Sequence, residues 1–242
     1  MLILAVDTAT TVASTALLRG DELIAEEYMN IPQKKHSERL MPLIDAMLKG
    51  AGYELGRIEG FAVSAGPGSF TGLRIGMGTL KGFAHVLDRP LVAVSTLEAL
   101  ASNFYYPGAI ICPLLDAKQG YLYLSLYLGT ETGLKQLYGH MAVRPEEVCG
   151  ILREQKGDIV LLGDGVDICR ELLLNGGIKY LEPPKSLRMP RASGTAYLGS
   201  KLLAAGKGFD YFALEPFYVR KSAAEINLRN KKESERRNSS RC

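Results

Sequence analysis

Residues 1–28 read MLILAVDTATTVASTALLRGDELIAEEY and place three strand-like runs one after another. The runs LILAV (2–6), VASTALL (12–18) and ELIAEEY (22–28) are apolar or β-branched for most of their length, and only a few residues separate them. Connections this short join antiparallel neighbours, so the stretch predicts a three-stranded meander at the start of the fold.

After the meander the pattern alternates between helix and strand, and the whole order then occurs a second time. The first half continues with a helical stripe at 37–49, the strand GFAVS (60–64), a helix after a glycine-rich run, the strand LVAV (91–94) and another helix. The second half has strands at 109–115, 121–128 and 134–141, a helix at 146–155, a strand at 158–163 and a helix at 167–174. Two β-β-β-α-β-α units predict a two-lobed α/β protein with a mixed sheet in each lobe, which is the ASKHA layout of actin, Hsp70 and the sugar kinases.

We assign residues 1–105 to the first lobe, 106–217 to a smaller second lobe and 218–242 to a C-terminal segment. The net charge of +3 is unevenly placed, since residues 226–242 hold six Lys or Arg and two Glu, which leaves 3 − 4 = −1 for the rest of the chain. We expect this basic tail to be a disordered, solvated terminus; a contact with nucleic acid is the alternative.

The N-terminus and the cysteines together indicate a cytoplasmic protein. The first run has no basic region before it and reaches Asp7 after six residues, so it is typical of a buried strand and not of a signal peptide or a membrane span. The four cysteines lie far apart with no C-x-x-C pair, which argues against a disulfide framework and against a zinc site.

The glycine-rich run AGPGSFTGLRIGMGTLKGFA (65–84) fits neither common phosphate-binding motif. Thr71 stands where a P-loop counted from Gly66 needs a glycine, no lysine follows it, and the same threonine breaks a dinucleotide fingerprint. The run instead has small residues at helical spacing, Gly72, Gly76 and Thr79, and Gly82 and Phe83 continue this stripe. Glycine inside a helix costs about 1 kcal/mol relative to alanine, so we expect a close helix contact, either with the lobe's own sheet or with another subunit.

The helix at 37–49 carries a second stripe, and it neighbours the glycine helix in the first lobe. Such a stripe normally packs in its own core, but two adjacent helices can also pair with the same two helices of another subunit as a four-helix layer. The residues predicted for this partner interface are Arg39, Leu40, Leu43, Ile44, Met47, Gly72, Arg74, Ile75, Gly76, Thr79 and Phe83.

Seven motifs carry a resemblance to a known family. They are ILAVDTAT (3–10), KKHSERLMP (34–42), SAGPGSFTGLRIG (64–76), VSTLEAL (94–100), LLDAKQG (114–120), LLGDG (161–165) and EPFYVRKSAAE (215–225). Together they resemble the TsaB (YeaZ) family over nearly the whole chain except the tail. The resemblance implies an accessory subunit that binds TsaD, with TsaE, and also itself, for threonylcarbamoylation of the adenosine beside the anticodon of tRNA. It implies that the chain contacts tRNA only through the complex, does not bind a membrane and holds no cofactor on its own. Whether ATP or ADP with Mg binds at the partner interface stays open.

The resemblance also implies that this chain is not the enzyme. TsaD-like proteins carry an H-x-x-x-H metal pair where this sequence has Thr96 and Leu100, and leucine cannot bind a metal ion. Ser95 and Glu98 form an S-x-x-E capping box, which predicts that the helix itself is kept. We therefore expect no catalytic residue and no metal site.

An ATP-dependent phosphotransferase is the alternative function. In kinases of this fold the first hairpin holds phosphate and magnesium, and here it offers Asp7, Thr8, Thr10 and Thr11 as a vestigial phosphate loop. Asp7 has a simpler explanation as an acidic cap on a tight turn.

Overall fold

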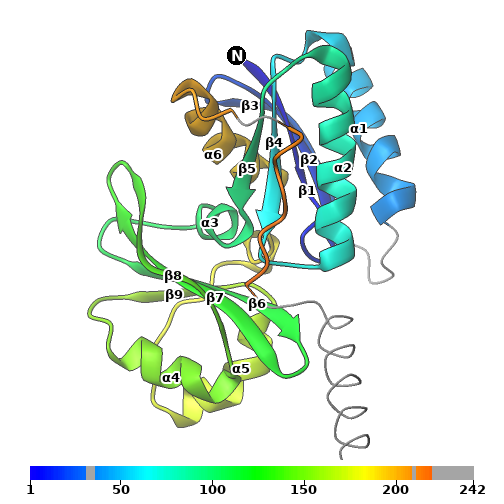
Figure 1. Ribbon diagram of the computed structural model, residues 1–242. Coiled ribbons are helices and arrows are strands. Elements are labelled where there is room, and N and C mark those ends of the chain that lie inside the picture. The colour runs from blue at the N-terminus through cyan, green and yellow to red at the C-terminus, as the bar shows by residue number, and fades with distance from the viewer. Residues whose placement is uncertain (31–35, 209–210, 220–242) are drawn as a thin grey trace, which may run out of the picture.

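The computed structural model describes residues 1–30, 36–208 and 211–219, and it has two lobes that lie one above the other in Figure 1. The first lobe is built on a five-stranded sheet in the order β3-β2-β1-β4-β5. Its strands are β1 (Leu2–Asp7), β2 (Val12–Arg19), β3 (Glu22–Asn30), β4 (Gly60–Gly66) and β5 (Leu91–Ser95). The first three strands form the antiparallel meander, and β4 and β5 add to it in parallel, so the sheet is mixed as the sequence predicts.

Helices cover both faces of this sheet. On one face lie α1 (His36–Ala51) and α2 (Phe70–Leu87), side by side in Figure 1, with the short helix η1 (Leu55–Arg57) between α1 and β4. Their apolar residues share a core with alternate residues of β1 and β4. α1 runs through Pro42 as one helix, and no second helix starts there.

The opposite face is covered by α6 (Ala192–Ala204), a helix that the sequence pattern did not reveal. Its small residues let it lie close to the sheet: a Cβ built at Gly199 would be 2.3 Å from the Cβ of Ala62. Arg191 and Glu26 form an ion pair at the start of the helix, and the Ser193 amide donates to Glu26. The assignment of all of 106–217 to the second lobe is therefore wrong, since α6 belongs to the first lobe by its packing.

The second lobe has a four-stranded sheet in the order β8-β7-β6-β9, with α4 (Pro145–Arg153) and α5 (Gly165–Asn175) on one face. Its elements are β6 (Ile110–Lys118), β7 (Tyr121–Thr130), β8 (Gly133–Val143), α4 (Pro145–Arg153), β9 (Ile159–Leu162), α5 (Gly165–Asn175) and the short helix η2 (Lys185–Leu187). The β-β-β-α-β-α order is thus present in both lobes, as predicted.

α3 (Thr96–Ala101) and the C-terminal segment are among the described segments that contact both lobes. α3 follows β5 and packs Leu97 and Leu100 against Ile111 and Val160 of the second sheet. The C-terminal segment 211–219 runs along the first lobe toward the second lobe (Figure 1), and the Phe217 amide donates to the Ala65 carbonyl at 2.9 Å. Among the described helices, none combines the length and the apolar character that crossing a bilayer requires.

Candidate functional site

The glycine-rich run packs α2 onto the hairpin between β1 and β2. The Ser69 amide donates to the Ala9 carbonyl at 2.7 Å, and the Thr8 hydroxyl donates to the Gly72 carbonyl at 2.7 Å. A Cβ at Gly72 would lie 2.0 Å from the Thr8 carbonyl oxygen, and one at Gly76 would lie 2.5 Å from the Thr8 hydroxyl oxygen. Real Cβ atoms do not approach other atoms so closely, so Gly72 and Gly76, the inner row of α2, allow the helix to touch its own lobe.

This packing corrects the predicted interface. Gly72 and Gly76 face the lobe's own sheet and hairpin, and the α1 stripe is buried in the same lobe because its side chains fill the space between the helix and the sheet. The predicted interface residues that are buried in this way are Leu40, Leu43, Ile44, Met47, Gly72 and Gly76. For these six positions, packing within the lobe is the explanation that the structure supports.

A second pair of glycines in α2 lies on the side that faces away from the sheet. Gly78 and Gly82 form this outer row, and a Cβ built at either position meets nothing within 4 Å. Large apolar side chains are also exposed on α1 and α2: Val86 on α2 is 81% exposed and Met41 on α1 is 48% exposed. The sequence pattern groups Gly82 with Gly72 and Gly76 and gives no role to Gly78, because spacing does not say which row faces the sheet.

The remaining predicted residues lie at or near this surface. Arg39 is exposed on α1, while Ile75, Thr79 and Phe83 are half-buried on α2. Arg74 is exposed, with its guanidinium 3.9 Å from the centroid of the Phe70 ring and its Nε donating to the Tyr218 hydroxyl at 3.3 Å. We call the exposed side of α2 that is made by Ile75, Gly78, Thr79, Gly82 and Val86 the outer face.

The hairpin residues do not form an open phosphate site. The Asp7 carboxylate is buried at the end of β1 and accepts the Ala9 amide at 3.0 Å, which is the cap on a tight turn that the sequence offers as the simpler role. Thr10 accepts the Val12 amide, and Thr11 donates to Asn30. Because Gly68 and α2 lie directly on the hairpin, with a Cβ at Gly68 2.4 Å from the Ala9 carbonyl oxygen, this arrangement does not fit a nucleotide phosphate.

The helix predicted from VSTLEAL (94–100) is present as α3. Ser95 caps α3 by accepting the Glu98 amide at 3.2 Å, which is one half of the predicted capping box. Thr96 and Leu100 are buried one turn apart on this helix. Within the described part of the chain, no group of three or more His, Cys, Asp or Glu side chains is arranged to hold a metal ion.

Ser95 makes a second contact that links the lobes. Its hydroxyl lies 2.8 Å from Nε2 of His140 on β8, and the His140 ring stacks on Phe217 with the ring centroids 4.9 Å apart. Burial lowers the pKa of His140, which favours the neutral ring. Sequence spacing did not indicate this pair, because 45 residues separate the two side chains.

Comparison with known proteins places this geometry in a family. A family model described as TsaD: tRNA N6-adenosine threonylcarbamoyltransferase matches residues 29–228. The tRNA threonylcarbamoyladenosine biosynthesis protein TsaB of Bacillus subtilis is 34% identical over 93% of this chain and 96% of its own length. The chain belongs to the TsaB (YeaZ) family.

Other members of the TsaB family agree with this assignment. The TsaB protein of Escherichia coli is 30% identical over 96% of this chain and 100% of its own length. The solved structure of YeaZ from Pseudomonas aeruginosa matches with a TM-score of 0.77 at 27% identity, and covers 90% of this chain and 99% of that one. The ethanolamine utilization protein EutJ, at 11% identity and a TM-score of 0.52, shares the fold alone. The predicted two-lobed ASKHA fold is confirmed.

Proposed function

We propose that this chain is a non-catalytic subunit in tRNA threonylcarbamoyladenosine biosynthesis, and that it binds a TsaD-type protein and a second copy of itself through the outer face. Relatives from several bacteria carry the name of this pathway, which supports a role in it. The observation that carries the proposal is the outer row, in which Gly78 and Gly82 lie open on a helix whose other glycines are explained by its own lobe.

The two exposed glycines of the outer row destabilise α2 within the lobe but favour contact with another helix. An exposed helical glycine costs about 1 kcal/mol relative to alanine and gives nothing back within the lobe. A flat strip without side chains does allow the backbone of another helix to come close, and the exposed Val86 side chain, one turn after Gly82, supplies apolar area beside it. A partner with the same fold would present the same two helices, so two pairs would form a four-helix layer.

Residues outside the outer face support the second part of the proposal, that this chain is not catalytic. Thr96 and Leu100 occupy the positions of the metal-binding pair, and both are buried. We infer that the TsaD-type partner performs the transfer, that TsaE and tRNA meet this chain within the complex, and that any nucleotide is held with residues of the partner, since the hairpin of this chain does not fit one.

The test places a long charged side chain on the outer row. Gly78→Arg should leave the lobe folded, because the position is open, and should abolish self-association and binding of the cognate TsaD-type protein, as measured by light scattering. Gly150→Arg is the matched control: Gly150 is also an open position in an exposed helix, on α4 of the other lobe, and it should change neither.

Modification of tRNA in the reconstituted system should fall together with partner binding, and circular dichroism should stay unchanged. If folded Gly78→Arg binds the partner as tightly as the wild type does, the partner uses another surface and the proposal is wrong.

A further inference from the structure

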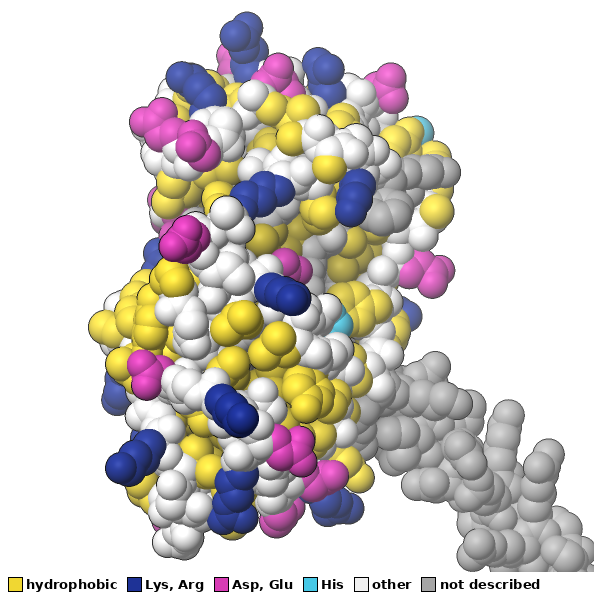
Figure 2. Space-filling view, turned by 90° about the vertical axis from the view of Figure 1, so that its left-hand side faces the viewer, with side chains coloured by type: hydrophobic (Ala, Val, Ile, Leu, Met, Phe, Trp, Pro, Cys, Tyr) yellow, Lys and Arg dark blue, Asp and Glu magenta, His cyan; other side chains and the backbone are white. Residues whose placement is uncertain are grey.

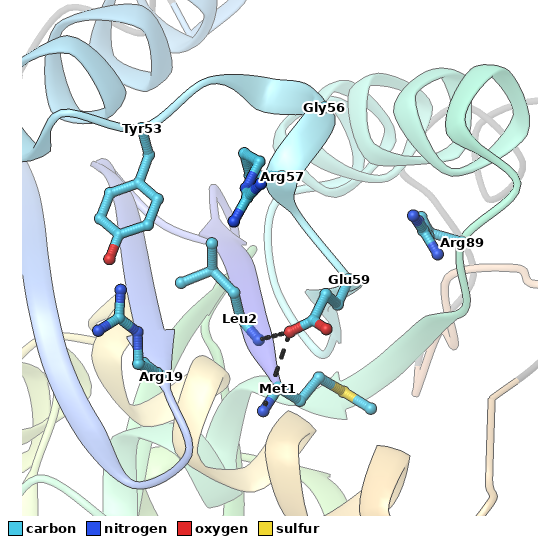
Figure 3. Close-up of a pocket in the computed structure, with 8 residues that line it drawn as sticks. All are labelled: Met1, Leu2, Arg19, Tyr53, Gly56, Arg57, Glu59 and Arg89. Atoms are coloured by element: carbon cyan, nitrogen blue, oxygen red, sulfur yellow. Dashed lines mark hydrogen bonds and ion pairs between the residues drawn. The ribbon is translucent and has the colours of Figure 1, made fainter.

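A basic pocket lies at the edge of the first lobe where β1 begins, on the side away from the second lobe (Figures 1 and 3). Its volume is about 540 Å³. The lining residues are Met1, Leu2, Arg19, Tyr53, Gly56, Arg57, Glu59 and Arg89. None of them belongs to the outer face or to the hairpin, so the function proposed above does not account for this pocket.

Three arginines reach the pocket from three different parts of the lobe. Arg19 ends β2, Arg57 ends η1, and Arg89 lies between α2 and β5. In Figure 3, Arg19 lies beside the Tyr53 ring, Arg57 points toward Leu2, and Arg89 lies beyond Glu59. A pocket into which separate elements bring three guanidinium groups has a strongly positive potential.

The single lining carboxylate does not cancel this charge. Glu59 accepts the Leu2 amide at 2.5 Å and lies 3.9 Å from the N-terminal ammonium of Met1. Counting the side chains alone, three arginines against one carboxylate leave 3 − 1 = +2 in the pocket. Residues 1–225, by contrast, hold 29 − 6 = 23 basic and 26 − 2 = 24 acidic side chains, and the face shown in Figure 2 mixes both signs. The cluster therefore does not follow from a generally basic surface.

Carboxylates neutralise some arginines of the described chain but not these three, nor Arg74 and Arg153. Arg170, Arg188 and Arg191 are paired with carboxylates. Arg19, Arg57 and Arg89 form no ion pair with any carboxylate of the described residues, and all three are exposed. Arg19 is held in place by the Tyr53 ring, whose centroid lies 5.4 Å from the guanidinium carbon.

We propose that this pocket binds phosphate groups, carried either by an RNA backbone or by a free nucleotide. Guanidinium groups bind phosphate oxygens through two parallel hydrogen bonds, and several of them facing one pocket suit an anion with more than one charge and several acceptor oxygens. The open shape suits a ligand that extends beyond the pocket. Because Tyr53 and Arg89 directly follow the ends of α1 and α2, a partner on the outer face would lie near the same ligand. The RNA source rests on the proposed function, whereas the phosphate chemistry does not.

The experiment removes two of the three positive side chains. Arg57→Gln with Arg89→Gln should keep the fold, because both side chains are exposed. The matched control is Lys156→Gln with Lys179→Gln, which removes the same charge from exposed positions of the second lobe. The probes are inorganic pyrophosphate and ATP, titrated into the full chain by calorimetry, and tRNA, titrated over a salt series into the chain alone and with its cognate TsaD-type protein.

If RNA is the source, the slope of log affinity for tRNA against log salt should become shallower by about 0.9 for each phosphate that the variant no longer neutralises, and the control pair should not change it. If a free nucleotide is the source, pyrophosphate or ATP binding should be abolished in the arginine variant alone, with the tRNA slope unchanged. The proposal is overturned if the wild type binds neither kind of phosphate, or if the arginine variant and the control variant bind equally well or equally poorly. Partner binding by light scattering should stay intact in both variants, so failure of this proposal is distinguishable from failure of the proposed function.

Discussion

Gly76 illustrates the close approach of α2 to the first-lobe sheet. A Cβ there would lie 2.5 Å from the Thr8 hydroxyl oxygen and 3.3 Å from Cγ1 of Val6, on the rigid end of a strand. Gly76→Ala should therefore lower the free energy of unfolding by about 1–3 kcal/mol through overpacking, although alanine is the better helix former. Urea unfolding checks this, and an alanine variant as stable as the wild type would show that the strand yields.

Asp7 is a buried carboxylate that forms no ion pair among the described residues, and His36 is the titratable cationic group nearest to it in effect. Oδ1 accepts the Ala9 amide, Oδ2 has no hydrogen-bond partner among the described residues, and burial raises the pKa above its ordinary value. Asp7→Asn keeps the acceptor and removes the charge, so it should raise the free energy of unfolding at pH 7 by about 1 kcal/mol.

The pH dependence of this effect follows from the sign of the shift. A folded-state pKa above the unfolded value stabilises the wild type as the pH falls through the folded pKa, so the advantage of Asp7→Asn should shrink toward acid pH. Chemical unfolding at several pH values measures the difference. If Asp7→Asn is instead less stable at pH 7, the carboxylate has a cationic partner and the turn-cap interpretation fails.

At the scale of an element, α2 is a helix whose outer row weakens it without any gain inside the lobe. Gly78→Ala with Gly82→Ala adds two methyl groups into open space, so the free energy of unfolding should rise by about 1–2 kcal/mol. Under the proposed function the same change should weaken partner binding, because the methyl groups hold the facing helix away. Thermal melting and light scattering on the same samples separate these effects, and unchanged stability would mean that the two positions are not open.

The elements of this fold differ in how much of them the sequence reveals. The strands and α1, α2, α4 and α5 are predictable because their apolar residues repeat at a clear period. α6 is not predictable in this way, since its sheet-facing residues Ala192, Ala196 and Gly199 are small. Its contact with the first sheet includes an ion pair between Glu26 and Arg191, which lie 165 residues apart in the sequence. The same limit applies to the site: Gly76 and Gly78 stand two residues apart, and only the fold shows that they face opposite surroundings.

At the scale of the whole molecule, His140 links the lobes through Ser95 and Phe217. Burial lowers its pKa in the folded state, so between the ordinary value of about 6.5 and this lower value the unfolded chain binds more protons. The free energy of unfolding should therefore fall as the pH drops from 7.5 to 5.5. His140→Gln keeps a hydrogen-bonding group without a titrating ring and should reduce this dependence; identical pH profiles for the two proteins would contradict the assignment.

The two glycine rows of α2 have a further consequence for how variation in this protein is tolerated. Substitutions in the inner row act on folding, so they should reduce the amount of protein that a cell retains, and with it growth. Substitutions in the outer row leave folding intact, so they should reduce growth while the protein stays abundant. A mutational scan that scores abundance and growth separately would thus divide the glycines of one helix into two classes, with Gly72 and Gly76 in the first and Gly78 and Gly82 in the second.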